Sequence, residues 1–202
     1  TVNPINDAPV AANDAVSIEE EQQLAITILE NDTDVDESSN LESNIIDPTS
    51  IVIEVQPGSG EVTIVDEATA QENSELQVGQ VIYIPDVNFF GADTFSYTVK
   101  DTLGAVSNTA TVTVSVGGVN DAPVANDDNA TTNEDESVVI AVTANDTDSE
   151  GEIDTQSVTI AQQGQLGNAT VDGNTGEITY TPNLNKFGTD TLRYSVKDSE
   201  GL

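Results

Sequence analysis

An internal repeat limits this chain to an architecture of two similar units. Residues 6–11 (NDAPVA) recur as residues 120–125, an offset of 114. A later set of matches, which carries Tyr97 onto Tyr194 and Asp101 onto Asp198, has an offset of 97. The first copy is therefore 17 residues longer, and the extra length falls in the polar, loop-like stretches 35–44 and 67–77. We expect a linker from a preceding repeat at 1–6, repeat 1 at 7–118 and repeat 2 at 119–202.

Apolar and polar residues alternate within each copy, which is the period of a β-strand. In the first copy the alternation covers residues 24–28, 51–55, 62–64, 81–85, 95–99 and 112–116. Six or seven short strands, with turn clusters such as 172–176 (DGNTG), predict an all-β fold of two tandem Greek-key β-sandwiches. The second copy stops before any counterpart of 107–116. We expect it to lack its last strand and to leave an edge that is frayed or paired with another chain.

The charge balance excludes several partners. The chain carries 37 Asp and Glu residues against 4 Lys and Arg, for a formal charge of -33. Nucleic acids and anionic lipids are polyanions, so we expect neither as a partner. The sequence has no run of 18 apolar residues, so we expect no direct membrane insertion. Hydrophobic residues make up 36% of the chain and fall in alternating runs, which argues against disorder.

The available ligand atoms favour calcium over other metals. The chain has no Cys and no His, which zinc, copper and iron sites usually need. Carboxylate, amide and carbonyl oxygens remain, and these suit Ca²⁺. Without disulfides, bound metal is one way to stabilise an extracellular module. The first residues, TVNPINDAPV, are no signal peptide, so we expect an internal fragment of a secreted or cell-surface protein.

Several motifs in a fixed order resemble a known family. Residues 107–112 (SNTATV) followed by 119–123 (VNDAP) look like the end of a cadherin repeat and its junction, and 142–148 (VTANDTD) resembles the cadherin Asp-x-Asp segment. Together with 133–136 (NEDE) and 180–183 (YTPN), they resemble bacterial cadherin-like and immunoglobulin-like repeats of large secreted adhesins, many of the RTX type. The resemblance implies a sandwich fold and a structural role outside the cell.

The same resemblance implies that Ca²⁺ lies between consecutive repeats. The middle junction would draw on residues of both repeats and the linker: Glu20, Asn120, Asp121, Asp146, Asp148 and Asp198. The junction before repeat 1 would use Asn6, Asp7, Asp32, Asp34 and Asp101, and Glu134 would face a third repeat. Gly118 stands where cadherins carry a first linker Asp, which removes a carboxylate. We therefore expect one or two ions per junction.

Elementary electrostatics supports a cation among these residues. Two carboxylates about 4 Å apart repel by roughly 1 kcal/mol in water and about 4 kcal/mol at an effective dielectric of 20. Alternate side chains of an extended turn point to one side, so Asp-x-Asp can offer two carboxylates to one ion. Two other interpretations remain: Asp and Asn as simple turn formers, and an EF-hand-type loop at Asp146, Asp148 and Glu150. No flanking helices are predicted for such a loop.

We expect a spacer or extender module that Ca²⁺ stiffens, with adjacent repeats as its partners and homophilic contacts as a further contribution. The alternative is a carbohydrate-binding module for surface or matrix polysaccharide, but the chain has no Trp and its eight Phe and Tyr residues mostly alternate inward. An enzyme is not expected, because the carboxylates cluster with turn residues and no base is set beside a nucleophile.

Overall fold

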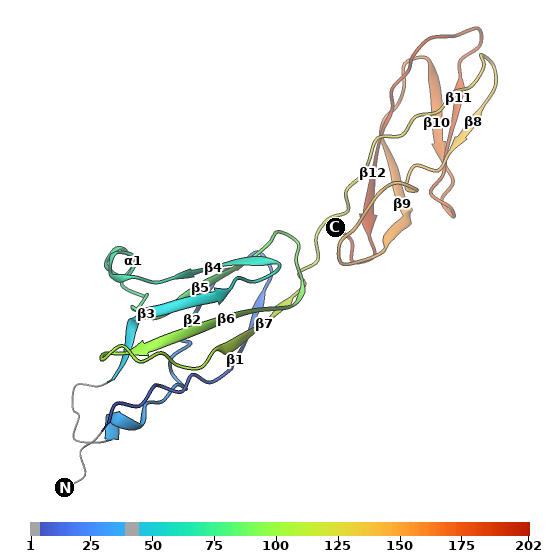
Figure 1. The fold of residues 1–202 in the computed structure, drawn as a ribbon. Helices are drawn as coiled ribbons and strands as arrows, with labels where there is room; N and C mark the ends of the chain where they lie inside the picture. Colours follow the sequence, from blue (N-terminus) through green and yellow to red (C-terminus); the bar gives the residue numbers. More distant parts are fainter. Residues whose placement is uncertain (1–4, 39–44) are drawn as a thin grey trace. The chain divides into compact units, whose positions relative to one another are not determined.

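The computed structural model describes residues 5–38 and 45–202. The chain divides into two compact units, Thr1–Gly118 and Val119–Leu202. Each is built from short strands (Figure 1), and each is described here by itself. None of the helices in the described ranges has the length and apolar character needed to cross a bilayer. The all-β prediction is confirmed.

Unit 1 is a sandwich of two sheets. The four-stranded sheet has the order β1 (Asp14–Glu19), β7 (Ala110–Gly117), β6 (Gly91–Asp101) and β3 (Ile46–Val55). The three-stranded sheet has the order β2 (Leu24–Ile26), β5 (Val81–Pro85) and β4 (Gly60–Ile64). β1 runs parallel to β7, and the other described pairs are antiparallel. All six strands predicted for this repeat are present, and β1 is an addition.

The core of unit 1 lies between these two sheets. Along β7, the side chains of Ala110, Val112, Val114 and Val116 are buried, and the residues between them are exposed. Phe95 of β6 and the inward side chains of β5 pack into the same core. Tyr83 and Tyr97 are fully buried there, as predicted for inward strand positions. The period of two therefore places one side of each strand in the core.

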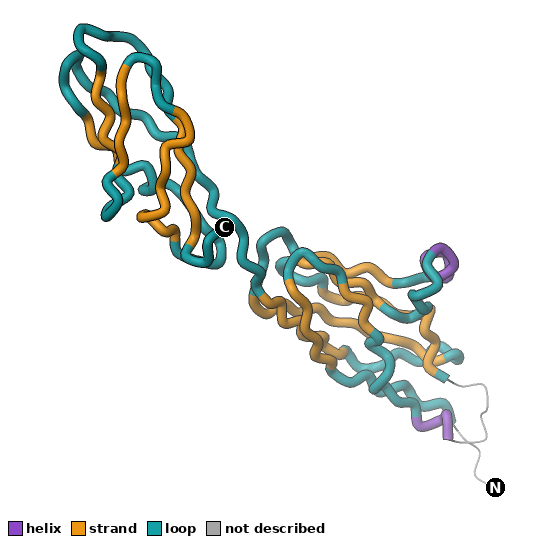
Figure 2. Tube along the Cα trace, turned by 180° about the vertical axis from the view of Figure 1, so that it is seen from behind, coloured by secondary structure: helices purple, strands orange, loops and turns teal. Residues whose placement is uncertain are grey.

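The extra length of unit 1 is partly helical, which the sequence did not predict. The stretch expected to be a loop at 67–77 contains α1 (Glu67–Glu72), and a 3₁₀ turn, η1 (Val35–Ser38), begins the other insertion (Figure 2). The Asp66 carboxylate caps α1 by accepting a hydrogen bond of 2.8 Å from the Thr69 amide. This cap satisfies an amide at the helix start, which explains how a polar loop gains one helical turn. The rest of the first insertion, 39–44, lies outside the described residues.

Unit 2 has fewer strands than unit 1. Its sheets are β10 (Gly167–Val171), β11 (Ile178–Pro182) and β8 (Val138–Ile140), and β12 (Arg193–Asp198) with β9 (Ile153–Gln162). Val142, Val158, Ala169 and Ile178 form its buried core. Within residues 119–202, no strand follows β12.

One aspartate in each unit ties the two sheets together. Asp93 accepts hydrogen bonds from the Gly58, Ser59 and Thr94 amides at 2.8–3.0 Å and from the Tyr83 hydroxyl at 3.0 Å. Burial alone would raise the pKa of Asp93, but these hydrogen bonds outweigh it and hold the pKa below its usual value. In unit 2, Asp190 accepts from the Gln165, Leu166 and Thr191 amides and from Tyr180 in the same way. The two aspartates therefore brace the fold.

Candidate calcium-binding clusters

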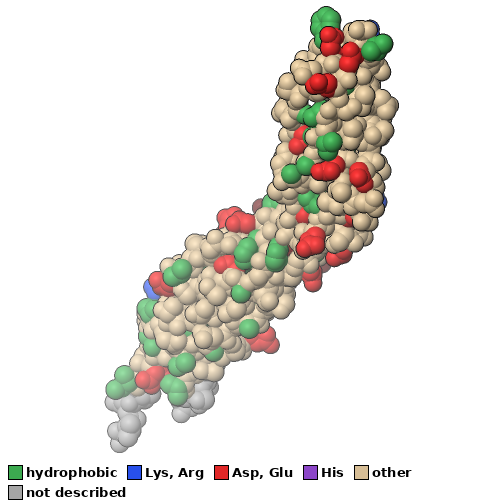
Figure 3. Space-filling view, turned by 90° about the vertical axis from the view of Figure 1, so that its right-hand side faces the viewer, with side chains coloured by type: hydrophobic (Ala, Val, Ile, Leu, Met, Phe, Trp, Pro, Cys, Tyr) green, Lys and Arg blue, Asp and Glu red, His purple; other side chains and the backbone are tan. Residues whose placement is uncertain are grey.

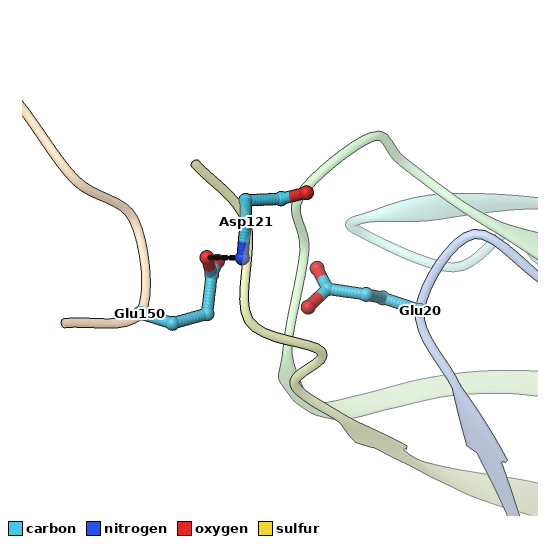
Figure 4. A group of neighbouring side chains, drawn as sticks. All are labelled: Glu20, Asp121 and Glu150. Atoms are coloured by element: carbon cyan, nitrogen blue, oxygen red, sulfur yellow. Dashed lines mark hydrogen bonds between the residues drawn. The ribbon is translucent and has the colours of Figure 1, made fainter. Parts of the chain in front are cut away.

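Unit 2 begins with a cluster of oxygen-bearing side chains. Asn120 and Asp121 lie at its N-terminal end, Asp148 and Glu150 lie in the turn that follows the Val124–Thr147 bridge, and Asp198 ends β12. The Asn120 side-chain amide donates a 2.7 Å hydrogen bond to the Asp198 carboxylate. The Asp121 backbone amide donates to the Glu150 carboxylate at 3.1 Å (Figure 4). These two bonds bring residues from three parts of unit 2 together.

The Asp148 side chain shapes the acidic turn. One of its carboxylate oxygens accepts hydrogen bonds from the Glu150 and Gly151 amides at 3.1 and 2.7 Å. The other oxygen, Oδ2, and Glu150 Oε1 are buried and find no hydrogen-bond partner among the described residues. Buried carboxylate oxygens without a donor are costly, because they have lost water and gained nothing in its place. The cluster therefore keeps acceptor atoms available for a cation.

Asp198 is almost completely buried at the base of this cluster. Its second oxygen accepts hydrogen bonds from the Glu200, Gly201 and Leu202 amides at 2.5–3.0 Å. Burial alone would raise the pKa of Asp198, but the Asn120 amide and these backbone amides lower it below its usual value. Asp198 is thus held ionised and fixed in position.

Unit 1 carries the same cluster at the equivalent positions. The Asn6 amide donates to Asp101 at 2.8 Å, and the Asp7 backbone amide donates to Asp36 at 2.8 Å. Asp34 accepts from the Asp36 amide at 2.9 Å, as Asp148 does from Glu150. Asp34, Asp36 and Asp101 are only 6%, 4% and 2% exposed, and Asp34 Oδ2 has no partner within the described residues. The acidic clusters of the two units are therefore held by the same pattern of hydrogen bonds.

The chemistry of both clusters fits a hard cation. The side-chain atoms that could bind a metal are all carboxylate or amide oxygens, which are the ligands that Ca²⁺ prefers. Acidic side chains are also spread over the face of both units seen in Figure 3, while the whole chain has four Lys and Arg residues to compensate them. Gathering several buried carboxylates without a counter-ion costs several kcal/mol per ion. A divalent cation would reverse the sign of that energy.

Two of the predicted ligands, Asp32 and Asp146, form different contacts. The Tyr97 hydroxyl lies 2.8 Å from the Ile28 carbonyl oxygen and 3.0 Å from each Asp32 carboxylate oxygen. Tyr194 meets Asp146 in the same way, at 2.9 and 3.0 Å. Asp32 and Asp146 therefore accept these tyrosine hydrogen bonds, and their role as Ca²⁺ ligands stays a prediction. A buried tyrosine hydroxyl needs a hydrogen-bond acceptor, and each of these hydroxyls lies within reach of both a backbone carbonyl and an Asp carboxylate.

A second carboxylate stands beside each of these pairs. Asp14 accepts a 3.1 Å hydrogen bond from the Asn31 side chain, and its Oδ2 is buried with no partner in the described part of unit 1. Burial, and then the charge of Asp32, raise the pKa of Asp14 to about 6. Burial and the nearby Asp146 charge likewise raise the pKa of Asp128 in unit 2. Each of these carboxyl groups therefore holds a proton more tightly than an exposed Asp does.

The two predicted glutamates differ in their surroundings. Glu20 directly follows β1 and is 1% exposed, and its backbone amide donates to the Gly117 carbonyl oxygen at 2.9 Å. A Cβ atom added at Gly118 would lie 3.6 Å from Glu20 Oε1, so Glu20 lies beside the last residue of unit 1. Glu134, its counterpart in unit 2, is exposed and lies outside any strand.

Asp36 and Glu150 are the cluster members that the sequence prediction omitted. Both stand two residues after a predicted ligand, in Asp34-x-Asp36 and Asp148-x-Glu150. The 114-residue offset extends through this acidic pair, and that was the available signal. From the sequence, Asp36 falls in the polar insertion 35–44, and Glu150 enters only as part of an EF-hand-type loop.

Comparison with known families now places the chain. Residues 6–118 match the bacterial cadherin-like domain, and residues 120–202 match the bacterial Ig domain. The chain belongs to the bacterial cadherin-like domain family. Domains of both kinds are typically structural and adhesion modules of extracellular surface proteins, and they are typically non-enzymatic.

Individual relatives are more distant. Integrin beta-like protein B of Dictyostelium discoideum is 35% identical over 91 residues, which are 45% of this chain and 5% of that protein. Drosophila N-cadherin EC1-4 has a TM-score of 0.50 at 13% identity, over 95% of this chain and 45% of that structure. The human desmocollin-1 ectodomain has a TM-score of 0.47 at 15% identity, over 99% and 36%. The chain spans less than half the length of each, and the N-cadherin likeness supports the fold alone.

Proposed function

We propose that the chain is a pair of calcium-binding structural repeats from an extracellular bacterial adhesin. Its function is mechanical: ions held where one repeat follows another stiffen the array, which extends a distant adhesive part toward a surface or a biofilm matrix. The adjacent repeats are the first partners, and homophilic contacts are a further contribution. Each junction holds one or two ions.

One observation carries this proposal: the same cluster occurs at the start of both units. In each, an Asn amide holds the Asp that ends a long strand, and a linker backbone amide holds an acidic side chain of the turn. Buried carboxylate oxygens remain without a hydrogen-bond donor in both described clusters. Asx turns alone do not need buried acids in this number, so the turn-former interpretation leaves them unexplained.

Glu20 provides the contribution of the preceding repeat. It is the buried carboxylate beside Gly118, where unit 1 ends, and the family resemblance assigns an early Glu of the preceding repeat to the shared ion. We propose that Glu20 and the unit 2 cluster of Asn120, Asp121, Asp148, Glu150 and Asp198 bind the same Ca²⁺. Extracellular calcium modules bind with dissociation constants of roughly 10⁻⁴–10⁻³ M, so the junction would be loaded outside the cell and not inside it.

The experiment combines calorimetry, melting and scattering on the full chain. We expect Ca²⁺ titration to give saturable binding, chelation to lower the melting temperature, and small-angle scattering to report more bending between the units without calcium. A Glu20→Gln variant separates the contribution of the preceding repeat from that of the unit 2 cluster. It should bind Ca²⁺ more weakly and remain flexible, while its unit 2 cluster stays intact. An unchanged melting temperature and an unchanged scattering curve on chelation would rule the mechanism out.

A carbohydrate-binding role is the second candidate, because one aromatic ring per repeat is exposed. Phe90 and Phe187 occupy equivalent positions and are 48% and 85% exposed, unlike the inward tyrosines. Sugar rings commonly stack on exposed aromatic faces. Binding to a polysaccharide array that persists in chelator, and that is lost in Phe90→Ala and Phe187→Ala, would favour this function over the spacer.

A further inference from the structure

The three-stranded sheet of unit 1 presents isoleucine side chains on its outward side. Alternate side chains of its central strand β5 are buried in the core, so Ile82 and Ile84 point outward. Ile84 is 45% exposed, and the strand neighbours of Ile82, Ala25 of β2 and Thr63 of β4, are exposed as well. Glu61 of β4 lies opposite Ile84. We call these five residues the β5 face, and four of them are uncharged in a chain of formal charge -33.

The fold itself does not require isoleucine at these two positions. The equivalent strand of unit 2, β11, is likewise the central strand of its three-stranded sheet. At the offset of 97 it carries Thr179 and Thr181 in place of Ile82 and Ile84. Threonine is as suitable for a strand as isoleucine is, and an outward isoleucine contributes nothing to the core. The isoleucines of the β5 face therefore need an explanation other than folding.

The same strand is preceded by an insertion that unit 2 does not have. Residues 65–80 join β4 to β5, whereas the short turn 172–177 joins β10 to β11. The base of the longer loop is fixed, because Val65 is fully buried and its amide donates to the Gln80 carbonyl oxygen at 2.9 Å. Beyond this base, α1 has no buried residue and stands at the end of β4 and β5 (Figure 1). The helix is therefore held in place without contributing to the core.

The insertion is acidic as well as exposed. It contains four exposed carboxylates, those of Asp66, Glu67, Glu72 and Glu75, and no basic residue occurs in the sequence before Lys100. An apolar surface beside a charged rim is the usual anatomy of a protein interface. A second copy of this chain would bring a further charge of -33 toward the rim, which opposes association. The charge of the rim therefore favours a basic partner.

We propose that the β5 face and the acidic loop 65–80 together form a docking surface for a basic, amphipathic segment of a partner protein. The aliphatic side chains of that segment cover Ile82 and Ile84, and its Lys or Arg residues lie beside the carboxylates of the loop. Apolar burial supplies most of the affinity, and the charges speed association and set the orientation. This binding uses none of the calcium-cluster residues, so it goes beyond the spacer function.

The first test titrates a synthetic amphipathic peptide, LKKLLKLLKKLLKL, into the full 202-residue chain in saturating Ca²⁺ and follows the backbone amides by NMR. We expect saturable shifts at residues 61–63, 66–76 and 82–84, and weaker binding as the salt concentration rises. The control peptide has Glu in place of every Lys and should cause no shifts. Shifts spread equally over the acidic clusters of both units would show attraction by net charge alone and would overturn the proposal.

The second test uses substitutions that the equivalent strand already carries. An Ile82→Thr, Ile84→Thr double variant gives β5 the outward residues of β11, so we expect it to fold and to bind the peptide roughly tenfold more weakly or worse. Replacing residues 65–80 by the sequence of 172–177 should also weaken binding and remove most of its salt dependence.

The matched control is a Thr179→Ile, Thr181→Ile double variant, which gives unit 2 the isoleucines without the acidic loop. It should gain little affinity for the peptide. Equal affinity of the wild type and the Ile82→Thr, Ile84→Thr variant would overturn the proposal. Shifts at the β5 face that depend on protein concentration without any peptide would assign the face to a second copy, and they would overturn it too.

Discussion

The side-chain amide of Asn120 lies 2.7 Å from the carboxylate of Asp198, and Asn6 has the same relation to Asp101 at 2.8 Å. In each unit this bond ties the entering chain to the end of a long strand. An Asn120→Asp change would put two carboxylates in contact, whereas Asn120→Ala only removes the bond. In chelator we expect both variants to melt below the wild type, with Asn120→Asp the lower. Calcium should restore most of the loss in Asn120→Asp and little in Asn120→Ala, as differential scanning calorimetry would detect.

Asp34 and Asp148 should be essential for ion binding. Each has one buried oxygen without a hydrogen-bond partner in the described structure, and the Asn variants replace a charged ligand by a neutral one. We expect Asp34→Asn and Asp148→Asn to weaken Ca²⁺ binding to their own cluster by roughly tenfold or more in calorimetric titration.

The matched controls for these variants are Asp32→Asn and Asp146→Asn. These residues lie two positions earlier but contact Tyr97 and Tyr194. Their calcium affinities should stay near that of the wild type. A loss of affinity equal to that of Asp34→Asn would instead support Asp32 as a Ca²⁺ ligand.

Asp14 should make unit 1 less stable as the pH rises. Its pKa is raised to about 6 in the folded state, from an ordinary value of 3.8. The folded state therefore holds this proton more tightly than the unfolded chain, and its stabilising effect is complete below pH 3.8 and lost as pH rises through 6. Asp14→Asn imitates the protonated form, so we expect it to be more stable by about 1 kcal/mol at pH 7, after allowance for solvent screening.

Denaturant unfolding in chelator from pH 3.5 to 7 would check this. The advantage of Asp14→Asn should shrink toward zero at the acidic end. A variant that is less stable than the wild type at pH 7 would contradict the proposed balance of burial and Asp32 charge.

The contribution of Asp93 to the free energy of unfolding should depend on pH in the opposite direction to that of Asp14. Its pKa is lowered, so its contribution is present above the ordinary pKa and is lost as the pH falls through the folded value. Asp93→Asn weakens acceptors for three amides and the Tyr83 hydroxyl, and we expect it to cost about 2–3 kcal/mol at pH 7. Glu61→Gln, on the exposed side of neighbouring β4, removes the same charge and should be nearly neutral. Urea denaturation of both variants would measure the difference.

The strands could be predicted from the sequence because each depends on a local period of two. Val112, Val114 and Val116 mark β7 unmistakably, and the structure has it there. β1 was missed because it offers only Val16 and Ile18 as alternating apolar residues, and its partner β7 lies far along the chain. Its pairing is a tertiary effect that no local pattern carries.

The candidate site was predicted less completely, for a related reason. The repeat offset identifies Asp34 and Asp148, but it cannot tell which neighbouring acid shares their side of the turn. The Tyr97 hydroxyl of β6 donates a hydrogen bond to Asp32, whereas the Asp36 amide donates to Asp34. That choice depends on a hydroxyl 65 residues away, so the alternation of side chains in the turn is an insufficient guide.

The hydrogen bonds that hold each acidic cluster together lie within a single unit and the few residues that enter it. Asn6 meets Asp101 entirely within the first unit, and Asn120 meets Asp198 entirely within the second. Recombination that deletes or duplicates one full unit therefore leaves every remaining set of these contacts whole. A protein built from such units can be lengthened or shortened by one unit while each remaining cluster keeps the hydrogen bonds that hold it together.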